Sequence, residues 1–405
     1  MKKSLAALAV LGAFAGTALA ANVTLYGIVD EGLVYTHLDK DVAGSDSTDT
    51  LSLDSGVLSG SRWGIKGVEE LSGSTKVGFQ LESGFDAGDG ESDNGGRLFG
   101  RQSTLFVEGA YGHLAAGRAG SLVSGAGSYQ IMGNSTALGT SYSTYTAQAG
   151  TIFSLAGRVD NAIFYKTPKF AGFQLSALYS FRKDNKSTTW DSDAEESVSL
   201  GSEGHSNTDR YAALGLTYAN GPFMAFLVGD FTDYSANTEG DDGYTVALGG
   251  NYDFGVAKVY LAGQYYDEVR VSTLGSTGIY KTRDNVGLAS TAKDGQLSAL
   301  WDQMKMKGWS ASLSASFPVW GGSLAAGLGY VDAEAADSVE DTFGEGTDFD
   351  FTRYVGTVAY TYPFSKRTTL YTFASYGQDK LEVNGRSDDQ KPSYAKVGIG
   401  LRHSF

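Results

Sequence analysis

Basic side chains recur at positions where a β-strand would turn them to one face. Arg62 alternates with Gly64 and Lys66. Trp63 and Ile65 occupy the positions between them. Because successive side chains of a strand point to opposite sides, Arg62 and Lys66 are expected on one face and the apolar pair on the other. Guanidinium and ammonium groups gathered on one wall would attract anions.

Two further arginines flank the long segment 119–156. Arg118 ends the alternating stretch before this segment, and Arg158 begins the stretch after it. No Asp or Glu occurs from residue 109 to residue 159, so the segment offers hydroxyl groups rather than carboxylates to the arginines. Its bulky members are Tyr129, Tyr142 and Tyr145.

The sequence contains no pattern that indicates a catalytic or metal centre. It has no Cys and four His, and it lacks the H-E-x-x-H and G-x-x-x-x-G-K-[ST] motifs of zinc hydrolases and P-loop proteins. His205 lies near Ser206 and Asp209, a composition too common to indicate a catalytic triad. We therefore expect no enzymatic activity, no cofactor and no bound metal.

Composition narrows the class of protein further. The 405 residues include 55 Gly, only 5 Pro and 24 Tyr, and 19% of the residues are charged. This chain is less charged than an ordinary soluble domain and too aromatic for a disordered one. The formal charge of −15 argues against a nucleic-acid partner, which requires a basic surface.

The first twenty residues read as a secretory signal peptide. Lys2 and Lys3 precede an apolar stretch that ends in Ala18-Leu19-Ala20, a small-residue cleavage site. A membrane anchor helix is the weaker alternative because the apolar stretch is short. We expect residues 1–20 to be removed and residues 21–405 to form one domain. Beyond residue 20 no apolar run approaches the roughly 20 residues of a spanning helix, so any membrane crossing would use strands.

Alternating apolar and polar residues fill the rest of the chain. Short turns flanked by aromatic residues, such as 218–223 and 362–366, separate some of the alternating stretches. Long, acidic segments separate the others, at 39–59, 87–98, 184–208, 234–243, 333–350 and 380–390. Short turns at one rim, long loops at the other and aromatic residues at both indicate an all-β, antiparallel transmembrane barrel.

Sixteen alternating stretches can be counted. They lie at 22–38, 60–70, 75–86, 99–109, 112–120, 157–168, 171–183, 209–219, 222–233, 244–253, 256–269, 306–318, 321–332, 351–362, 367–379 and 391–405. Eighteen strands remain open if 270–305 contains a hairpin, although 297–306 reads better as a short helix. A barrel of sixteen to eighteen strands has an aqueous lumen, unlike the filled barrel of about eight strands that a purely structural or adhesive protein would use.

The chain resembles the general diffusion porins of Gram-negative bacteria, most closely those of β-proteobacteria. The motifs that carry the resemblance are Leu25-Tyr26-Gly27, the run 61–67 followed by Glu69-Glu70-Leu71, Gly100-Arg101-Gln102, Ala116-Gly117-Arg118 and the terminal Phe405. The resemblance implies an outer-membrane homotrimer of 16-stranded barrels that passes small hydrophilic solutes. It also implies that the third external loop folds inward as the constriction.

The resemblance assigns roles to several residues. Arg62, Arg118 and Arg158 match a basic ladder on the wall of the pore, and Lys66 shares a face with Arg62. Phe405 matches a terminal signal read by the outer-membrane assembly machinery. Asp30, Asp160, Arg97 and Arg101 are secondary candidates for the pore. Arg101 shares its parity with Leu105 and Val107, which predicts a position at the lipid-facing rim.

The constriction loop of related porins usually presents carboxylates opposite the ladder, and this chain has none there. We therefore expect a net positive constriction that prefers anions. Each Arg could instead pair with a carboxylate for structural reasons. A substrate-specific porin for phosphate, another anionic solute or a sugar is the alternative, since Arg270, Lys281, Arg283, Lys293 and Lys305 cluster in one segment.

Two clusters of acidic residues lie in the predicted external loops. The residues are Asp184, Asp191, Asp193, Glu195, Glu196, Asp332, Glu334, Asp337, Glu340 and Asp341. They would favour cations at the mouth, but over distances that salt screens. Their carboxylates could also bind lipopolysaccharide through divalent cations, or simply keep the loops solvated.

Overall fold

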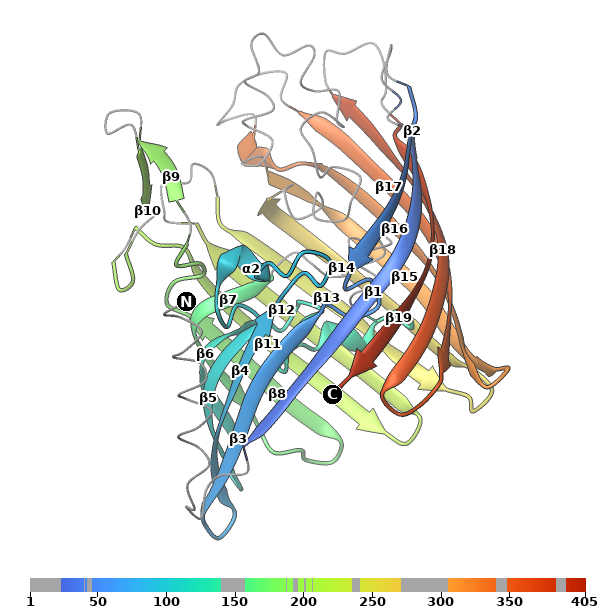
Figure 1. Ribbon diagram of the computed structural model, residues 1–405. Coiled ribbons are helices and arrows are strands. Elements are labelled where there is room, and N and C mark those ends of the chain that lie inside the picture. The colour runs from blue at the N-terminus through green and yellow to red at the C-terminus, as the bar shows by residue number, and fades with distance from the viewer. Residues whose placement is uncertain are drawn as a thin grey trace.

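An antiparallel β-sheet that closes on itself forms the described part of the chain (Figure 1). The computed structural model describes residues 23–39, 41, 46–139, 157–186, 188–191, 196–199, 202–205, 207–234, 241–270, 305–339, 348–383 and 391–405. Closure occurs where β1 (Thr24–Asp39) pairs with β19 (Ser393–Ser404). On its other side β1 pairs with β2 (Thr48–Ser55) along its second half and with β3 (Arg62–Ser72) along its first half.

The remaining strands follow one another around the barrel in chain order. They are β4 (Thr75–Gly84), β5 (Gln102–Gly109), β6 (Gly112–Gly120), β7 (Arg158–Lys166), β8 (Phe173–Ser180), β11 (Arg210–Asn220), β12 (Phe223–Asp233), β13 (Gly243–Asp253), β14 (Lys258–Arg270), β15 (Lys305–Val319), β16 (Gly322–Ala335), β17 (Phe349–Pro363) and β18 (Thr368–Val383). With β2 and β3 as two halves of one barrel strand, the predicted sixteen-stranded antiparallel barrel is confirmed.

Short elements occur where only loops were expected. Strand β2 lies within the acidic segment 39–59, where Leu51 and Leu53 alternate with polar residues and carried a signal for it. The hairpin β9 (Thr188–Asp191) with β10 (Glu196–Ser199) lies within 184–208, and α2 (Asp93–Gly96) and η1 (Met132–Asn134) are single turns. Among the described residues no helix is long and apolar enough to cross a membrane.

Two expectations fall partly or wholly on residues 271–304, which lie outside the described ranges. These are the additional hairpin that would give eighteen strands and most of the helix expected at 297–306. The last two residues of that expected helix, Lys305 and Met306, begin strand β15 instead.

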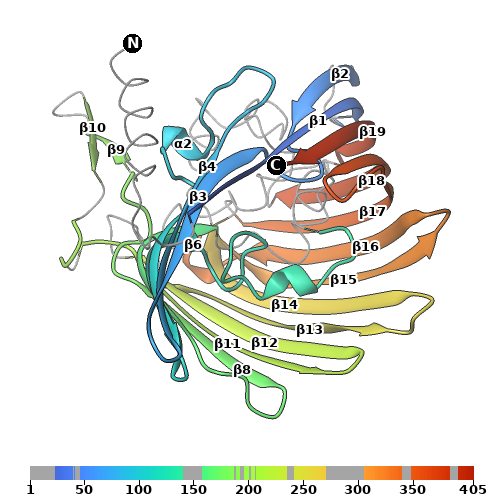
Figure 2. The ribbon, with the colours of Figure 1, turned by 60° about the horizontal axis from the view of Figure 1, so that its bottom comes forward.

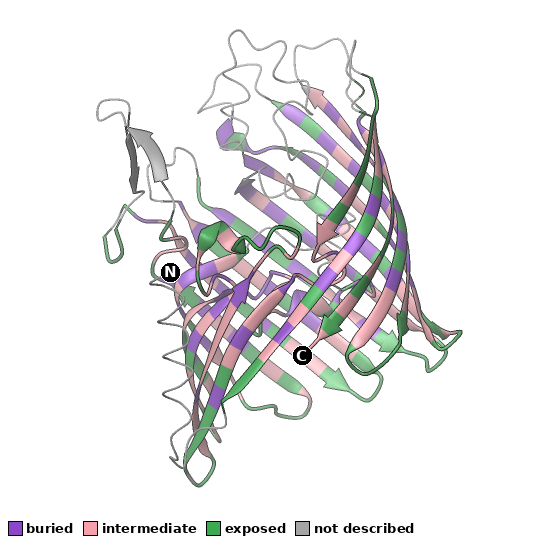
Figure 3. Cartoon of the chain, viewed as in Figure 1, coloured by how far each residue is buried: buried purple, intermediate pink, exposed green. Residues whose placement is uncertain are grey.

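The two faces of the sheet differ in the way that a barrel in a membrane requires. Exposed and buried residues alternate along each strand (Figure 3). In β13, Val246 and Leu248 are exposed and point outward, whereas Thr245 and Ala247 on the other face are buried. Apolar side chains therefore cover the outside, and the inside is left for polar groups.

Exposed aromatic residues gather at both rims of the outer surface. At the short-turn rim they are Tyr111, Phe170, Phe173, Phe223, Tyr252, Phe254, Phe317, Trp320, Tyr362, Phe364 and Phe405. At the long-loop rim they are Tyr35, Tyr179, Phe181, Phe231, Tyr244, Tyr265, Trp309, Tyr354 and Tyr376. Such belts mark the two interfaces of a bilayer.

The C-terminal residue fastens the closing pair of strands. The backbone N of Gly27 donates to the carbonyl of Phe405 at 3.2 Å, and the N of Phe405 donates back to Gly27 at 3.1 Å. The ring of Phe405 lies so close to Gly27 that a Cβ on residue 27 would be 2.2 Å from ring atom Cζ. A glycine is required at position 27 because the terminal ring occupies the space of a side chain.

We predict that Gly27→Ala and deletion of Phe405 both lower the yield of assembled barrel, because each disrupts the contact between Gly27 and Phe405 at the closing pair of strands. The current through each barrel that does assemble should not change. Heat-modifiable migration on gels measures the yield. Gly263→Ala is the matched control, since its nearest neighbour would lie 3.5 Å from the new Cβ. Wild-type yield from both variants would contradict the prediction.

Candidate functional site

Neighbouring strands bring the predicted arginines together on the inner wall. Arg118, near the end of β6, donates from Nε to the carbonyl of Gly100 at 2.8 Å. Arg158, at the start of β7, donates from Nε to the carbonyl of Arg101 at 3.0 Å. Arg62 in β3 pairs with Glu82, the carboxylate that also pairs with Arg101. The three residues of the predicted ladder therefore converge on Gly100 and Arg101.

Glu82 is the carboxylate at the centre of this group, and the sequence interpretation missed it. Its Oε1 lies 2.8 Å from Arg101 Nε and 3.8 Å from Arg62 Nη1. Its Oε2 accepts a hydrogen bond of 2.9 Å from the hydroxyl of Tyr26. Glu82 is only 12% exposed, and it alternates with Gln80 on the polar face of β4, which was the signal for it.

Asp160 is a second carboxylate among the arginines. It forms an ion pair with Arg118 through Oδ1, and its Oδ2 lies 3.5 Å from Arg97 Nη2. The backbone N of Asn185 donates to the same Oδ2 at 2.9 Å. Arg97 also pairs with Asp184, so a residue from the loop after β4 belongs to the cluster.

Arg158 differs from its neighbours. No carboxylate in the described part of the chain lies within ion-pairing distance of its guanidinium. Besides the Arg101 carbonyl, it donates from Nη1 to Asn94 Oδ1 in α2 at 3.0 Å. Its positive charge is therefore held by neutral acceptors rather than by a carboxylate.

Arg101 lies elsewhere than its parity predicted. Its side chain is in the inner cluster with Glu82 rather than at the lipid-facing rim. The parity argument failed because β5 begins at Gln102, so the alternation seen at Leu105 does not extend back to residue 101.

Two other candidates occupy distinct places. Lys66 lies further along β3 than Arg62, with its Nζ 5.2 Å from the centroid of the Tyr26 ring. Asp30, considered as a counter-charge in the pore, is 0% exposed and is enclosed by backbone groups and the hydroxyl of Tyr371.

The described half of the segment between β6 and β7 runs along the interior of the barrel. Within it Tyr129 stacks on Phe164 with centroids 4.3 Å apart and has its hydroxyl 3.1 Å from His113 Nε2. Burial raises the pKa of Tyr129 to about 12, so the phenol stays protonated at physiological pH.

The same segment then crosses to distant strands. Asn251 of β13 donates from Nδ2 to the carbonyl of Asn134 at 3.1 Å, and Ala137 N donates to Ser314 Oγ of β15 at 2.9 Å. Figure 2 shows this stretch, coloured blue-green, inside the ring of strands. Tyr142 and Tyr145 lie outside the described residues.

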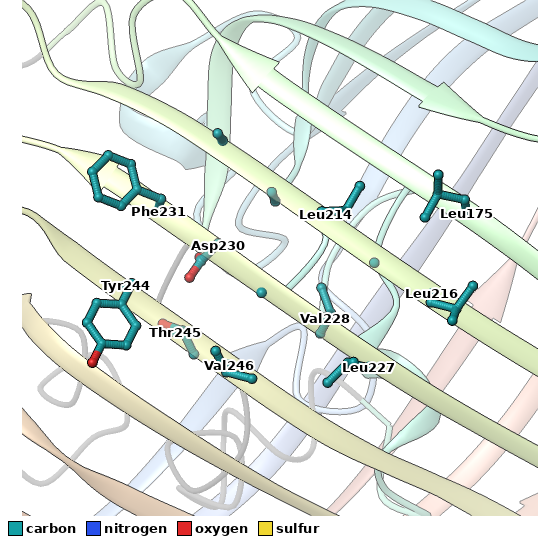
Figure 4. A pocket seen from close by; sticks show the side chains of 14 residues that line it. Leu175, Leu214, Leu216, Leu227, Val228, Asp230, Phe231, Tyr244, Thr245 and Val246 are labelled. Carbon is teal, nitrogen blue, oxygen red and sulfur yellow. The ribbon is translucent and has the colours of Figure 1, made fainter.

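The other features of the described chain offer no comparable chemistry. No group of three His, Asp or Glu side chains in the described ranges is placed to hold a metal ion. A hollow of about 720 Å³ between Leu214, Leu227 and Val246 lies on the outward face of β11–β13 (Figure 4). Asp230 and Thr245 also line it, but its exposed side chains are apolar, so it belongs to the surface that meets lipid.

Comparison with known proteins gives consistent results. Residues 7–382 match the model of the Gram-negative porin family. The chain is 34% identical to an outer membrane porin of Bordetella pertussis and 30% identical to outer membrane porin protein 32 of Delftia acidovorans, over the full length of each. Its fold is similar to that of an anion-selective porin from Comamonas acidovorans, with a TM-score of 0.62 and 24% identity, covering 95% of this chain and 100% of that one.

We predict that Glu82→Gln increases the preference of the lumen for anions, because Arg62 and Arg101 lose their shared carboxylate. A unit charge about 8 Å from the ion path is worth about 0.5 kcal/mol at the dielectric constant of water, or about a twofold change in the permeability ratio. The reversal potential in a KCl gradient measures this ratio.

Glu108→Gln is the matched control for this prediction. It removes the same charge from a carboxylate that lies at the short-turn rim and pairs with His113 rather than with the arginine cluster. An unchanged reversal potential in Glu82→Gln, or an equal shift in the control, would contradict the role of Glu82.

Proposed function

The chain belongs to the Gram-negative porin family, and on this premise we propose that its channel prefers anions. It is an outer membrane protein of a Gram-negative bacterium, and its barrel passes small hydrophilic solutes and ions by passive diffusion. Charges at the narrowest part of such a pore determine which ions it favours.

The observation that carries the proposal is the imbalance of charge around Arg158. Four guanidinium groups, those of Arg62, Arg97, Arg101 and Arg118, share the carboxylates of Glu82, Asp160 and Asp184, and the fifth, that of Arg158, pairs with none of them. Positive charge is therefore in excess, and Arg158 is the member without an ion pair among the described residues. In a lumen with low-dielectric walls this charge acts over a longer range than it would on a surface.

The acidic loops at the long-loop rim oppose this preference. Their charges face a wide, solvated mouth, where the Debye length is about 8 Å at physiological ionic strength. The arginine cluster is largely buried, so salt screens it less than it screens the loops. We expect the cluster to decide the sign of the selectivity and the loops to reduce its size.

We also propose that segment 119–156 forms the constriction. The contacts of residues 129–137 with β6, β7, β13 and β15 support this role. Hydroxyl and amide groups, rather than carboxylates, would then lie opposite the arginines. Small anions would meet hydrogen-bond donors on both sides of the passage.

One of the basic residues on which the hypothesis of a substrate-specific pore depends is buried. Lys305 is 2% exposed, and its Nζ lies 3.5 Å from Glu268 Oε2, so it is not available to bind a solute. Lys281, Arg283 and Lys293 lie outside the described residues. Block of single-channel current by low concentrations of a solute would favour a specific pore over a general one.

We predict a reversal potential of anion sign for the wild-type channel in a KCl gradient, and a decrease of about twofold in anion preference for Arg158→Gln. Arg367→Gln is the control, because it removes the same charge from the exposed short turn between β17 and β18. A reversal potential of cation sign in the wild type would refute the proposed selectivity.

We further propose a homotrimer whose subunits meet through β2–β5. OmpT, an outer membrane protein of Vibrio cholerae with a similar fold, has been solved in a trimer form. In the described part of this chain no exposed aromatic residue falls between residues 36 and 110, whereas β8, β12, β13, β14, β15, β17 and β18 each carry at least one. A surface without such belts is suited to protein contact rather than to the bilayer interface.

The trimer proposal predicts a difference between two outward-facing leucines. A fluorophore on Leu105→Cys in β5 should be protected from a lipid-soluble quencher by the neighbouring subunit. The same label on Leu248→Cys in β13, where the native side chain is similarly exposed, should be quenched. Equal quenching at both positions would exclude this interface.

Processing and assembly complete the proposal. We expect cleavage after Ala20 and recognition of Phe405 by the outer-membrane assembly machinery. The acidic loops could bind lipopolysaccharide through divalent cations.

A further inference from the structure

The wall of the barrel contains a large bulge between β2 and β3. Ile28 of β1 pairs with Arg62, and Glu31 pairs with Ser55. The two residues between Ile28 and Glu31 therefore face the six residues 56–61. An ordinary bulge sets two residues against one, so this insertion is unusually large and must leave the plane of the sheet.

The bulge turns into the barrel. Val57 is 0% exposed and packs in one cluster with Val34 and Tyr371, whose side chains are on the inner face of β1 and β18. Leu138, from the segment between β6 and β7, belongs to the same cluster. The bulge and the segment proposed to form the constriction therefore contribute to one apolar cluster.

The other end of the bulge reaches the arginine cluster. A Cβ placed on Gly60 would lie only 3.0 Å from Nη1 of Arg101. The guanidinium of Arg101 thus rests against the backbone of residue 60, while Glu82 holds its Nε. The bulge connects the ladder on one side with the segment 121–139 on the other.

A buried carboxylate holds the bulge in place. The backbone N atoms of Leu58 and Ser59 donate to Asp30 Oδ2 at 3.1 and 2.6 Å. The Tyr371 hydroxyl donates to Oδ1 at 2.6 Å. Hydrogen bonds to an ionised acceptor are about twice as strong as neutral ones, so three of them fix the bulge firmly. Arg402 stands opposite Asp30 in the register of β19 and supports its charge.

We infer that residues 56–61 are a second, wall-borne element of the constriction, and that Asp30 is the residue that positions it. The inference rests on the proposed channel function. In this inference the bulge positions Arg101 and packs with Leu138 in one cluster. The width and the charge of the passage therefore depend on the buried carboxylate of Asp30.

Asp30→Asn is the first test. It keeps the size of the side chain but removes the charge that strengthens the three hydrogen bonds. We expect more frequent transitions between conductance levels, by about tenfold, and a weaker anion preference as Arg101 loses its support. Asp54→Asn is the matched control. Asp54 lies in β2 opposite Gly32, outside the bulge, so this substitution removes the same charge and leaves the bulge unchanged.

The outcomes of this test are distinct. Wild-type behaviour of Asp30→Asn, or equal changes in both variants, would overturn the inference. The proposed function would be unaffected if the wild-type channel still showed anion selectivity in the same recordings.

A second variant covers the case in which Asp30→Asn fails to assemble. The chain has no cysteine, so Ser59→Cys gives a single reactive thiol on the bulge. A negatively charged methanethiosulfonate should modify it and reduce the current stepwise, because the bulge lines the passage. Ser365→Cys, on the exposed short turn after β17, should react without any change in current. Modification of Ser59→Cys that leaves the current unchanged would overturn the inference.

Discussion

The absence of water inside a bilayer is the constraint from which the rest of this structure follows. Each backbone N–H and C=O group at membrane depth needs a partner within the protein, which leaves a closed sheet as the solution for a chain built of strands. Here closure depends on the pairing of β1 with β19 and on the backbone bonds that join Gly27 to Phe405. Closure also divides the side chains into an apolar outer set and an inner set that is free to be polar.

The inner set explains how a strongly acidic protein can hold a cluster of arginines. Glu82 and Asp160 lie on the wall itself, one strand away from the arginines that they balance, so the wall provides its own counter-charge. The segment between β6 and β7, which the sequence shows to lack Asp and Glu, is not needed to balance the guanidinium groups. Arg158 is held by a carbonyl and an amide oxygen, so its charge is the one that the described carboxylates leave unpaired.

The constriction that we propose draws on three separate pieces of chain. Tyr129 stacks on Phe164 and holds the inner segment near β6 and β7, and Leu138 of the same segment belongs to one apolar cluster with Val57 of the bulge at 56–61. Asp30 of β1 accepts hydrogen bonds from that bulge, and Gly60 leaves room for Arg101. In this proposal the width and the charge of the passage depend on the same few contacts.

The sequence by itself determined the type of fold and most of its strands, because the period-two pattern of each strand is a local property and the aromatic turns mark its ends. It also predicted Arg62, Arg118 and Arg158 as residues of the pore, because alternation placed Arg62 and Arg158 on a polar face and the resemblance to general diffusion porins matched all three to a basic ladder. Only the tertiary structure decided which charges meet. Glu82 meets Arg101, and Asp160 meets Arg97, because closure and strand stagger bring together residues far apart in the chain. Parity misplaced Arg101 because it lies just outside a strand, and no local pattern distinguishes the buried Asp30 from a carboxylate that lines the pore.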